Sequence, residues 1–350
     1  MRDFDLEQEA LGLLTPEVLD AVALAREARA RVELRRELAP ARLDTLREHA
    51  RIQSAGASNR LENISTPDAR LHAIVGGTAE PRTRDEREIA GYRFVLDLIH
   101  ENHEHMEVTP NVILRLHRDL YRYTDAAHAG RWKDGDNVIV GRGVDGTARV
   151  RFVPPSALET PDAVTSLCAS YASAEQAGRT DPLLLSALLT FDCVSIHPFN
   201  DGNGRLSRLL SLLTLYRGGY DVGRYVSIEA EIERSKATYY EALERSSAGW
   251  REGAADYLPF ATYYLGVVLA CYRELDRQLE ALAAGGTAYD VVRACLENAT
   301  CPLSKREIMN AIPLVSQRSI ERALARLQEE DLVEKVGAAR ATKYRWIGER

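Results

Sequence analysis

The chain of 350 residues is long enough to bury a sizeable core and to form more than one domain. Its composition, 45% hydrophobic and 28% charged, is that of an ordinary globular protein. A formal net charge of −7 argues against binding of nucleic acid or of an anionic membrane over the whole surface.

The cysteines and the first residues predict a cytoplasmic protein. The five cysteines are scattered, odd in number and without CxxC spacing, which favours free thiols over disulfides or a zinc site. The acidic start MRDFDLEQEA lacks the basic and apolar regions of a signal peptide. No apolar run approaches the ~20 residues that a membrane-spanning helix needs.

The pattern along the chain predicts a mainly α-helical fold in three regions. Residues 1–85 read as helices, the first opened by the TPE cap at 15–17 and continuing through Leu38. Residues 86–282 read as a helical core. Residues 287–350 read as a separate small domain after an AAGG linker.

The core contains one convincing β pattern. Two β-rich runs flank the DG dipeptide at 145–146, which predicts a β-hairpin over 137–153. An almost wholly apolar helix follows from the DP cap at 181–182. A second apolar helix ends at the GG pair of 218–219.

The last region has the pattern of a winged-helix domain. Ser304 and Glu307 form a capping box for a short helix, and Ser316 caps another helix with one apolar face. The segment LVEKVGAARATKYRWI then reads as a closing hairpin.

Twelve residues, HPFNDGNGRLSR from His197 to Arg208, place a dense set of polar groups between the two apolar helices. Gly202, Asn203 and Gly204 stand directly before the second helix. Glycines there let backbone N–H groups approach an anion, and the helix dipole adds to the attraction. The sequence therefore predicts a phosphate site.

The charged side chains of this motif suit the same ligand. Arg205 and Arg208 are three residues apart, hence close on one helical face, and can bind further phosphate oxygens. Asp201 is a hard oxygen ligand suited to Mg²⁺, which usually binds one carboxylate plus substrate phosphates. His197 can accept a proton near neutral pH. Together they predict phosphoryl or nucleotidyl transfer from a nucleotide.

Four further histidines lie in polar helical sequence of the core. Their order lacks the HExxH pattern of a zinc protease, so a solvated helix face is predicted rather than a metal cluster. They are His100, His103, His105 and His117.

The stretch HPFNDGNGRLSR resembles the signature of Fic-domain proteins, HPFx(D/E)GNGRxxR, at every specified position, and a looser resemblance covers about 90–270. It implies a protein adenylyltransferase. His197 would take the proton of a Ser, Thr or Tyr hydroxyl, on a target protein or on the chain itself, and the oxygen would attack the α-phosphate of ATP. Asp201 would hold Mg²⁺ while Gly202–Gly204 and Arg205 hold the phosphates.

The resemblance also implies a docking hairpin and an adenine pocket. The hairpin corresponds to the family's flap, which aligns the target by strand addition. Its docking residues would be Val138, Ile139, Val140 and Gly141. Tyr239, Tyr240 and Leu243 resemble the adenine pocket. The alternatives are a hairpin that only caps the domain and tyrosines that only fill the core.

The stretch SNRLEN fits the family's inhibitory pattern (S/T)xxxE(G/N) through Ser58, Glu62 and Asn63, in a helix predicted at about 54–66. By this resemblance Glu62 would neutralise Arg208 and misalign the α-phosphate of bound ATP. A misplacement of about 1 Å can cost roughly a hundredfold in rate. In some relatives the same glutamate positions a water that removes AMP, so a reverse activity is also considered.

The winged-helix domain leaves two kinds of partner open. With 11 Lys and Arg against 9 Asp and Glu, its net charge of +2 is small for a protein that binds duplex DNA. A protein contact, such as a homodimer, is therefore favoured over DNA. The polar face would present Gln317, Arg318, Arg322 and Arg326.

Two rival functions remain beside AMP transfer. One is a DNA-binding regulator whose Fic core only senses a nucleotide. The other is transfer of a different phosphate-linked group, against which the intact Gly202 and Gly204 argue, since relatives that act as kinases carry a lysine in place of a motif glycine.

Overall fold

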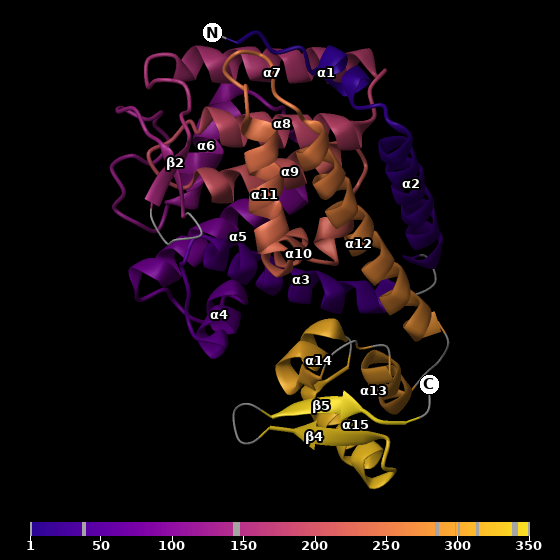
Figure 1. Cartoon of the computed structure of the whole chain (residues 1–350). Coiled ribbons are helices and arrows are strands. Elements are labelled where there is room, and N and C mark those ends of the chain that lie inside the picture. Colours follow the sequence, from indigo (N-terminus) through magenta and orange to yellow (C-terminus); the bar gives the residue numbers. More distant parts are fainter. Residues whose placement is uncertain are drawn as a thin grey trace. The chain divides into compact units, whose positions relative to one another are not determined.

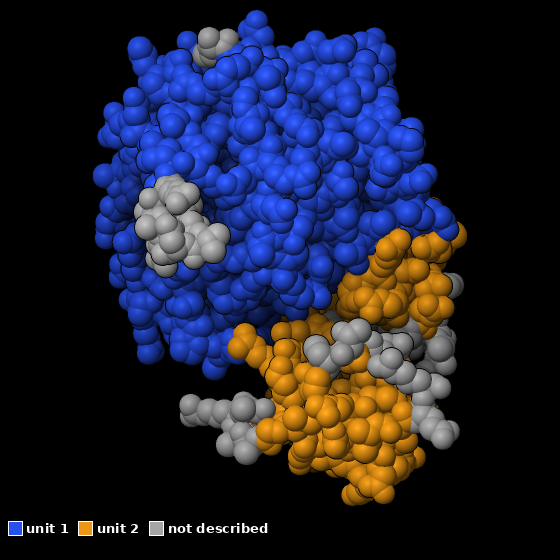
Figure 2. Space-filling model, viewed as in Figure 1, with its two compact units in different colours: residues 1–29, 50–272 blue, residues 30–49, 273–350 orange. Residues whose placement is uncertain are grey.

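The computed structural model is mostly α-helical, with small β-sheets (Figure 1). It describes residues 2–36, 40–142, 148–283, 287–297, 299, 302–312, 315–337 and 342–348. The chain forms two compact units, residues 1–29 with 50–272 and residues 30–49 with 273–350 (Figure 2). In this described part, no helix is both long enough and apolar enough to cross a bilayer.

The first unit contains the elements before residue 273, each assigned here to the unit that holds most of it. Its α-helices are α1 (Leu6–Gly12), α2 (Pro16–Arg36), α3 (Pro40–Leu61), α4 (Asp68–Val75), α5 (Arg84–Asn102), α6 (Pro110–Leu120), α7 (Thr160–Ala177), α8 (Pro182–Ile196), α9 (Asn203–Arg217), α10 (Ile228–Arg234), α11 (Lys236–Ser247) and α12 (Leu258–Ala283). Its strands are β1 (Ile139–Arg142) and β2 (Ala148–Phe152), and its short 3₁₀ helices are η1 (His103–His105) and η2 (Val222–Arg224).

Helices α8 and α9 are the most deeply buried pair of the first unit. Asp181 begins α8, because its side chain accepts a hydrogen bond from the N–H of Leu183. Almost every side chain of both helices is buried, as expected from their apolar sequence. Each large apolar side chain buried in this way contributes roughly 1.5–3 kcal/mol. The pair is therefore a firm base for the loop between them, residues 197–202.

The predicted hairpin is present, with β1 antiparallel to β2. Val140 lies opposite Val150, and the register is irregular between Ile139 and Val140. Val138, Val140 and Val150 are 51%, 54% and 61% exposed. An apolar strand that stays in solvent is what a docking edge requires.

The second unit has the helices and the closing hairpin that the sequence predicts after the linker, and its assignment as a winged helix stays a prediction. Its elements are α13 (Ala288–Glu297), β3 (Leu303–Ser304), α14 (Lys305–Ala311), α15 (Gln317–Glu329), β4 (Val333–Val336) and β5 (Lys343–Trp346), with strand order β3-β5-β4. Ser304 and Glu307 form the capping box, and Ser316 caps α15. Ile320, Leu327 and other apolar side chains fill its core.

Some sequence predictions concern residues outside those described. They are the end of the first long helix at Leu38, the hairpin turn at 145–146, most of the linker at 283–286, and Cys301. The four described cysteines, Cys168, Cys193, Cys271 and Cys295, are free thiols. Residues 50–85, predicted within a separate N-terminal region, lie in the same compact unit as the core helices.

Candidate active site

The loop between α8 and α9 turns the chain sharply. His197 has φ 49° at the end of α8, and Gly202 has φ 81° before α9. The side chain of Asn203 accepts from the N–H of Phe199 at 2.9 Å and donates to the Phe199 carbonyl at 2.7 Å. The Asn203 side chain thus closes the turn, and the first N–H groups of α9, which begins at Asn203, have no partner within the helix.

A carboxylate lies directly over the N-terminal turn of α9. A Cβ added to Gly204 would stand 2.1 Å from Oε1 of Glu62 and 3.2 Å from a guanidinium nitrogen of Arg208. Only glycine permits this approach. The first N–H groups of a helix have no partner within the helix and attract negative charge. The carboxylate of Glu62 therefore marks an anion site formed by Gly204 and Arg208.

Two residues of the segment 58–63 hold Arg208. Its Nε donates to Oγ of Ser58 at 2.8 Å, and its Nη2 donates to the Ser58 carbonyl at 2.9 Å and to Oε1 of Glu62 at 2.8 Å. Arg208 is 3% exposed. Burial by itself lowers the pKa of Arg208, but Glu62 and nearby tyrosines raise it, and the net pKa lies above the usual value. The structure thus brings together the two residues that the sequence pairs.

Glu62 follows a helix end and does not lie within a helix over 54–66. Helix α3 ends at Leu61, and Asn63 adopts φ 62° while its N–H donates to the Arg60 carbonyl at 3.0 Å. Glycine and asparagine are the residues that favour a left-handed conformation after a helix. This accounts for the final Gly or Asn of the inhibitory pattern and for the turn that directs Glu62 at α9.

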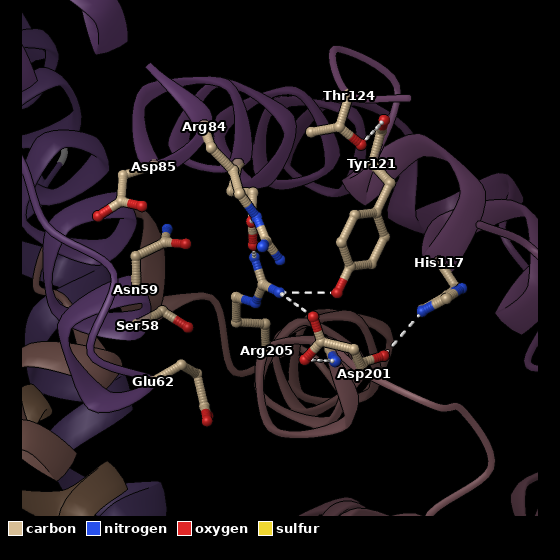
Figure 3. A network of polar contacts seen from close by, with 12 residues as sticks. Ser58, Asn59, Glu62, Arg84, Asp85, His117, Tyr121, Thr124, Asp201 and Arg205 are labelled. Atoms are coloured by element: carbon tan, nitrogen blue, oxygen red, sulfur yellow. Dashed lines mark hydrogen bonds and ion pairs between the residues drawn. The ribbon is translucent and has the colours of Figure 1, made fainter. Parts of the chain in front are cut away.

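Two residues that the sequence did not indicate hold Arg205. Its Nη1 donates to Oε2 of Glu88 at 2.7 Å, and its Nη2 donates to the hydroxyl of Tyr121 at 2.8 Å. Arg205 and Glu88 are 1% and 2% exposed. Figure 3 shows Tyr121 and Asp201 meeting the guanidinium of Arg205 from the same side. The direction of this guanidinium is therefore fixed before any ligand binds.

Asp201 suits a magnesium ion. Its side chain is 50% exposed, and Oδ2 lies 3.7 Å from Nη2 of Arg205. Burial raises the pKa of Asp201, but the Tyr121 hydroxyl, Arg205 and the Gly202 N–H outweigh it, so the pKa is lowered and the group is ionised at neutral pH. The described residues contain no group of three or more metal-binding side chains. Asp201, a single half-exposed carboxylate beside an anion site, fits a Mg²⁺ ion whose other ligands are substrate phosphates and water.

His197 is a neutral imidazole at neutral pH. Burial is the main cause that lowers the pKa of His197 to about 4, and the ammonium of Lys133 also lowers it. Nδ1 lies 3.4 Å from the carbonyl of Val194. A hydrogen on Nδ1 is donated to this carbonyl, which leaves the lone pair on Nε2. Such a ring can accept a proton.

His117 is buried, so the prediction of a solvated helix face is wrong for this residue. It is 0% exposed and stacks on Phe199, with ring centroids 3.7 Å apart. The N–H of Gly130 donates to Nδ1 at 3.0 Å, so Nε2 carries the hydrogen and donates to the Asp201 carbonyl at 3.0 Å (Figure 3). His117 thus ties α6 to the motif loop. His105, by contrast, is exposed.

The substitution His117→Phe tests this tie. A phenyl ring keeps the stacking on Phe199 but leaves the Gly130 N–H and the Asp201 carbonyl without their partner. We expect the free energy of unfolding, measured by urea denaturation, to fall by about 1–3 kcal/mol. His105→Phe is the control for an exposed position. Equal urea midpoints for His117→Phe and the parent protein would contradict this role.

The residues assigned to an adenine pocket lie together on α11. Tyr239 and Leu243 are 5% and 8% exposed, and the rings of Tyr239 and Tyr240 lie 5.2 Å apart. Arg151 of β2 donates to the Tyr240 carbonyl, which joins the hairpin to this helix. Burial raises the pKa of Tyr240 and the charge of Glu62 raises it further, because the two groups are close. Adenine binding stays a prediction.

A family comparison agrees with the geometry of the motif. Residues 107–215 match the model of the Fic/DOC family, so this part of the chain is a Fic domain. Protein adenylyltransferase fic-1 of Caenorhabditis elegans is 30% identical over 160 residues, which are 46% of this chain and 27% of that protein. Protein adenylyltransferase Fic of Drosophila ananassae is 31% identical over 147 residues, 41% of this chain and 26% of that protein. The chain spans about a quarter of the length of these relatives.

Solved structures share the fold. A Fic family protein from Desulfovibrio desulfuricans G20 has a TM-score of 0.60 at 23% identity, covering 96% of this chain and 98% of that one. The structure of Fic-1 (aa134 - 508) from C. elegans has a TM-score of 0.56 at 22% identity, covering 75% of this chain and 74% of that one. The mainly helical Fic fold with a hairpin is therefore confirmed for this chain.

Proposed function

We propose that this chain is a protein adenylyltransferase that transfers AMP from ATP to a Ser, Thr or Tyr hydroxyl of a protein. The observation that carries the proposal is the Glu62 carboxylate over Gly204, paired with Arg208. It supports an anion site beside the neutral ring of His197. The names of the relatives, protein adenylyltransferases, support AMP as the group transferred.

The reaction would use the residues of the motif as follows. Nε2 of His197 takes the hydroxyl proton as the oxygen attacks the α-phosphate. The new O–P bond forms while the bond from the α-phosphorus to pyrophosphate breaks, and AMP stays on the target. The N–H groups before α9, with Arg205 and Arg208, hold the phosphate charges in place. Asp201 would hold Mg²⁺, which supplies further neutralisation of those charges.

The target would bind along the exposed hairpin. Strand addition to β1 would bring a target segment close to the motif loop. Residues 133–137, which contact that loop, come directly before the strand. The docking residues proposed from the sequence, Val138 to Gly141, lie on this strand or just before it.

The proposed regulation is autoinhibition by Glu62. Its carboxylate lies where a phosphate oxygen would otherwise meet Gly204 and Arg208. ATP that binds beside it would carry its α-phosphate out of line with His197. Removal of AMP by a water held on Glu62 is the reverse activity that the same arrangement would allow.

Two labels on ATP test the proposed reaction. The Glu62→Gly protein is incubated with a protein target and Mg²⁺, and with ATP labelled at the α-phosphate or at the γ-phosphate. Protein labelled only from the α position supports AMP transfer. Label from the γ position alone would mean a kinase, and no label from either would remove the transferase.

The pH profile is expected to follow the depressed pKa of His197. Because the pKa is lowered to about 4, the ring is neutral and competent over the whole range above it. Lowering the pH from 7 to about 5.5 should therefore change kcat/KM for AMP transfer by less than about twofold. Initial rates of the Glu62→Gly protein provide the measurement. An acidic limb near the ordinary histidine value of about 6.5 would contradict this assignment.

The winged-helix unit is proposed to contact protein, including a second copy of the chain. Several of its basic side chains form ion pairs with neighbouring acids, namely Lys305 with Glu321, Arg326 with Glu330 and Lys343 with Glu307. Such pairing weakens the field available to DNA, so the DNA-binding regulator gains no support.

The free thiols of the described cysteines favour the cytoplasm as the setting.

A further inference from the structure

The backbone of His197 is held in a conformation that its sequence disfavours. Its φ of 49° lies in the left-handed region, which costs a non-glycine residue of order 1–3 kcal/mol. The residue before a proline is normally extended, and Pro198 follows. A strained residue persists only where its surroundings hold it firmly.

One neighbouring segment, residues 133–137, supplies such a hold. The backbone N–H of Lys133 donates to the Pro198 carbonyl at 2.9 Å, and its ammonium donates to the Ile196 carbonyl at 3.2 Å. The same ammonium donates to Oδ1 of Asn137 at 2.9 Å. That bond fixes which end of the Asn137 amide is oxygen, so its NH₂ faces the loop.

The NH₂ of Asn137 completes the set. It lies 3.4 Å from the carbonyl of His197 and 3.3 Å from that of Phe199. Four consecutive carbonyls, residues 196–199, thus accept hydrogen bonds from two residues of one short segment.

The ammonium of Lys133 is costly to bury. Lys133 is 3% exposed, and its ammonium donates to two amide oxygens, those of Ile196 and of the Asn137 side chain. Burial is the main cause that lowers its pKa to about 8. Burying an ammonium is costly unless hydrogen bonds compensate, so this side chain depends on its contacts to Ile196 and Asn137.

We propose that Lys133 and Asn137 are positioning residues for the catalytic base. They hold the carbonyls of the 196–199 turn so that the imidazole of His197 faces the bound α-phosphate. The segment continues into β1, so the same residues position the base relative to the proposed docking strand. This inference rests on the proposed function.

Kinetics separate positioning from nucleotide binding. In the Glu62→Gly background, Lys133→Met and Asn137→Ala should each lower kcat by about 10- to 100-fold, because a small displacement of a base is costly. The KM for ATP should stay within about twofold, since neither residue contacts the anion site. Lys133→Arg, which keeps the charge and the donors, should recover most of the loss. Unchanged kcat, or an equal change in kcat and in ATP affinity, would overturn the proposal.

Amide hydrogen exchange tests the hold without any activity. The N–H groups of His197 and Phe199 should exchange at least about tenfold faster in Lys133→Met and Asn137→Ala than in the parent, while those of α9 stay protected. The exposed Lys335→Met is the matched control. Equal exchange in all variants would overturn the proposal. If the Glu62→Gly parent transfers no AMP, the proposed function fails. The exchange rates would still show whether Lys133 and Asn137 hold the 196–199 turn.

Discussion

Replacing Glu62 by glycine should raise the rate of AMP transfer about a hundredfold, because misplacement of the reacting groups by about 1 Å costs that much. The carboxylate now pairs with Arg208 at 2.8 Å and covers Gly204. Without it, the guanidinium and the N-terminal turn of α9 can take the γ-phosphate. Incorporation of α-labelled AMP into protein measures the change.

A matched control separates the loss of the Glu62 carboxylate from the added backbone freedom of a glycine. Glu80→Gly introduces the same substitution at an exposed residue between α4 and α5, and should leave the low basal rate unchanged. Ser58→Ala removes one of the Arg208 contacts but keeps the carboxylate, so a smaller activation is expected. Equal incorporation by the intact and Glu62→Gly proteins would mean that Glu62 is no brake.

Replacing His197 by alanine in the Glu62→Gly background should lower kcat by about 10²- to 10⁴-fold, the usual contribution of a general base. Binding of ATP should change little, because the proposed phosphate contacts come from Gly204, Arg205 and Arg208. Rapid-mix kinetics and a nucleotide-binding assay on the same preparation measure the two quantities. His105→Ala is the control for an exposed histidine. A double variant that adenylates protein as fast as its parent would remove His197 from the chemistry.

The motif loop and its flanking helices could be predicted from the sequence, because the information is local. Glycine and an apolar run follow one another within a few residues, so the turn and the N-terminus of α9 are encoded together. The cap of α8 at Asp181 and the capping box at Ser304 are local in the same way. Glu62 was found from a pattern whose last position, Asn63, proves to be a left-handed helix end.

The residues behind the motif could not be predicted so directly. Glu88 pairs with Arg84, four residues before it, as helical spacing suggests, but its carboxylate is also buried against Arg205, far along the chain. Lys133 lies in a loop with no periodicity that would indicate burial. Such contacts depend on tertiary packing and leave no local pattern.

His117 is the case where a usable pattern was present. Ile113, Leu116 and Leu120 form a helical stripe at intervals of three and four, and position 117 lies on the same face. Because the helix buries this face, His117 is buried with it. The polar residues beside it in the sequence favoured the prediction of a solvated face.

A structure of the Glu62→Gly/His197→Ala protein with ATP and Mg²⁺ tests the central claim most directly, since this variant should bind the nucleotide without consuming it. We expect the triphosphate over the first turn of α9, with its terminal oxygens at Arg208 and its α-phosphate facing position 197. A triphosphate bound away from Gly204 and Arg208 would contradict the account.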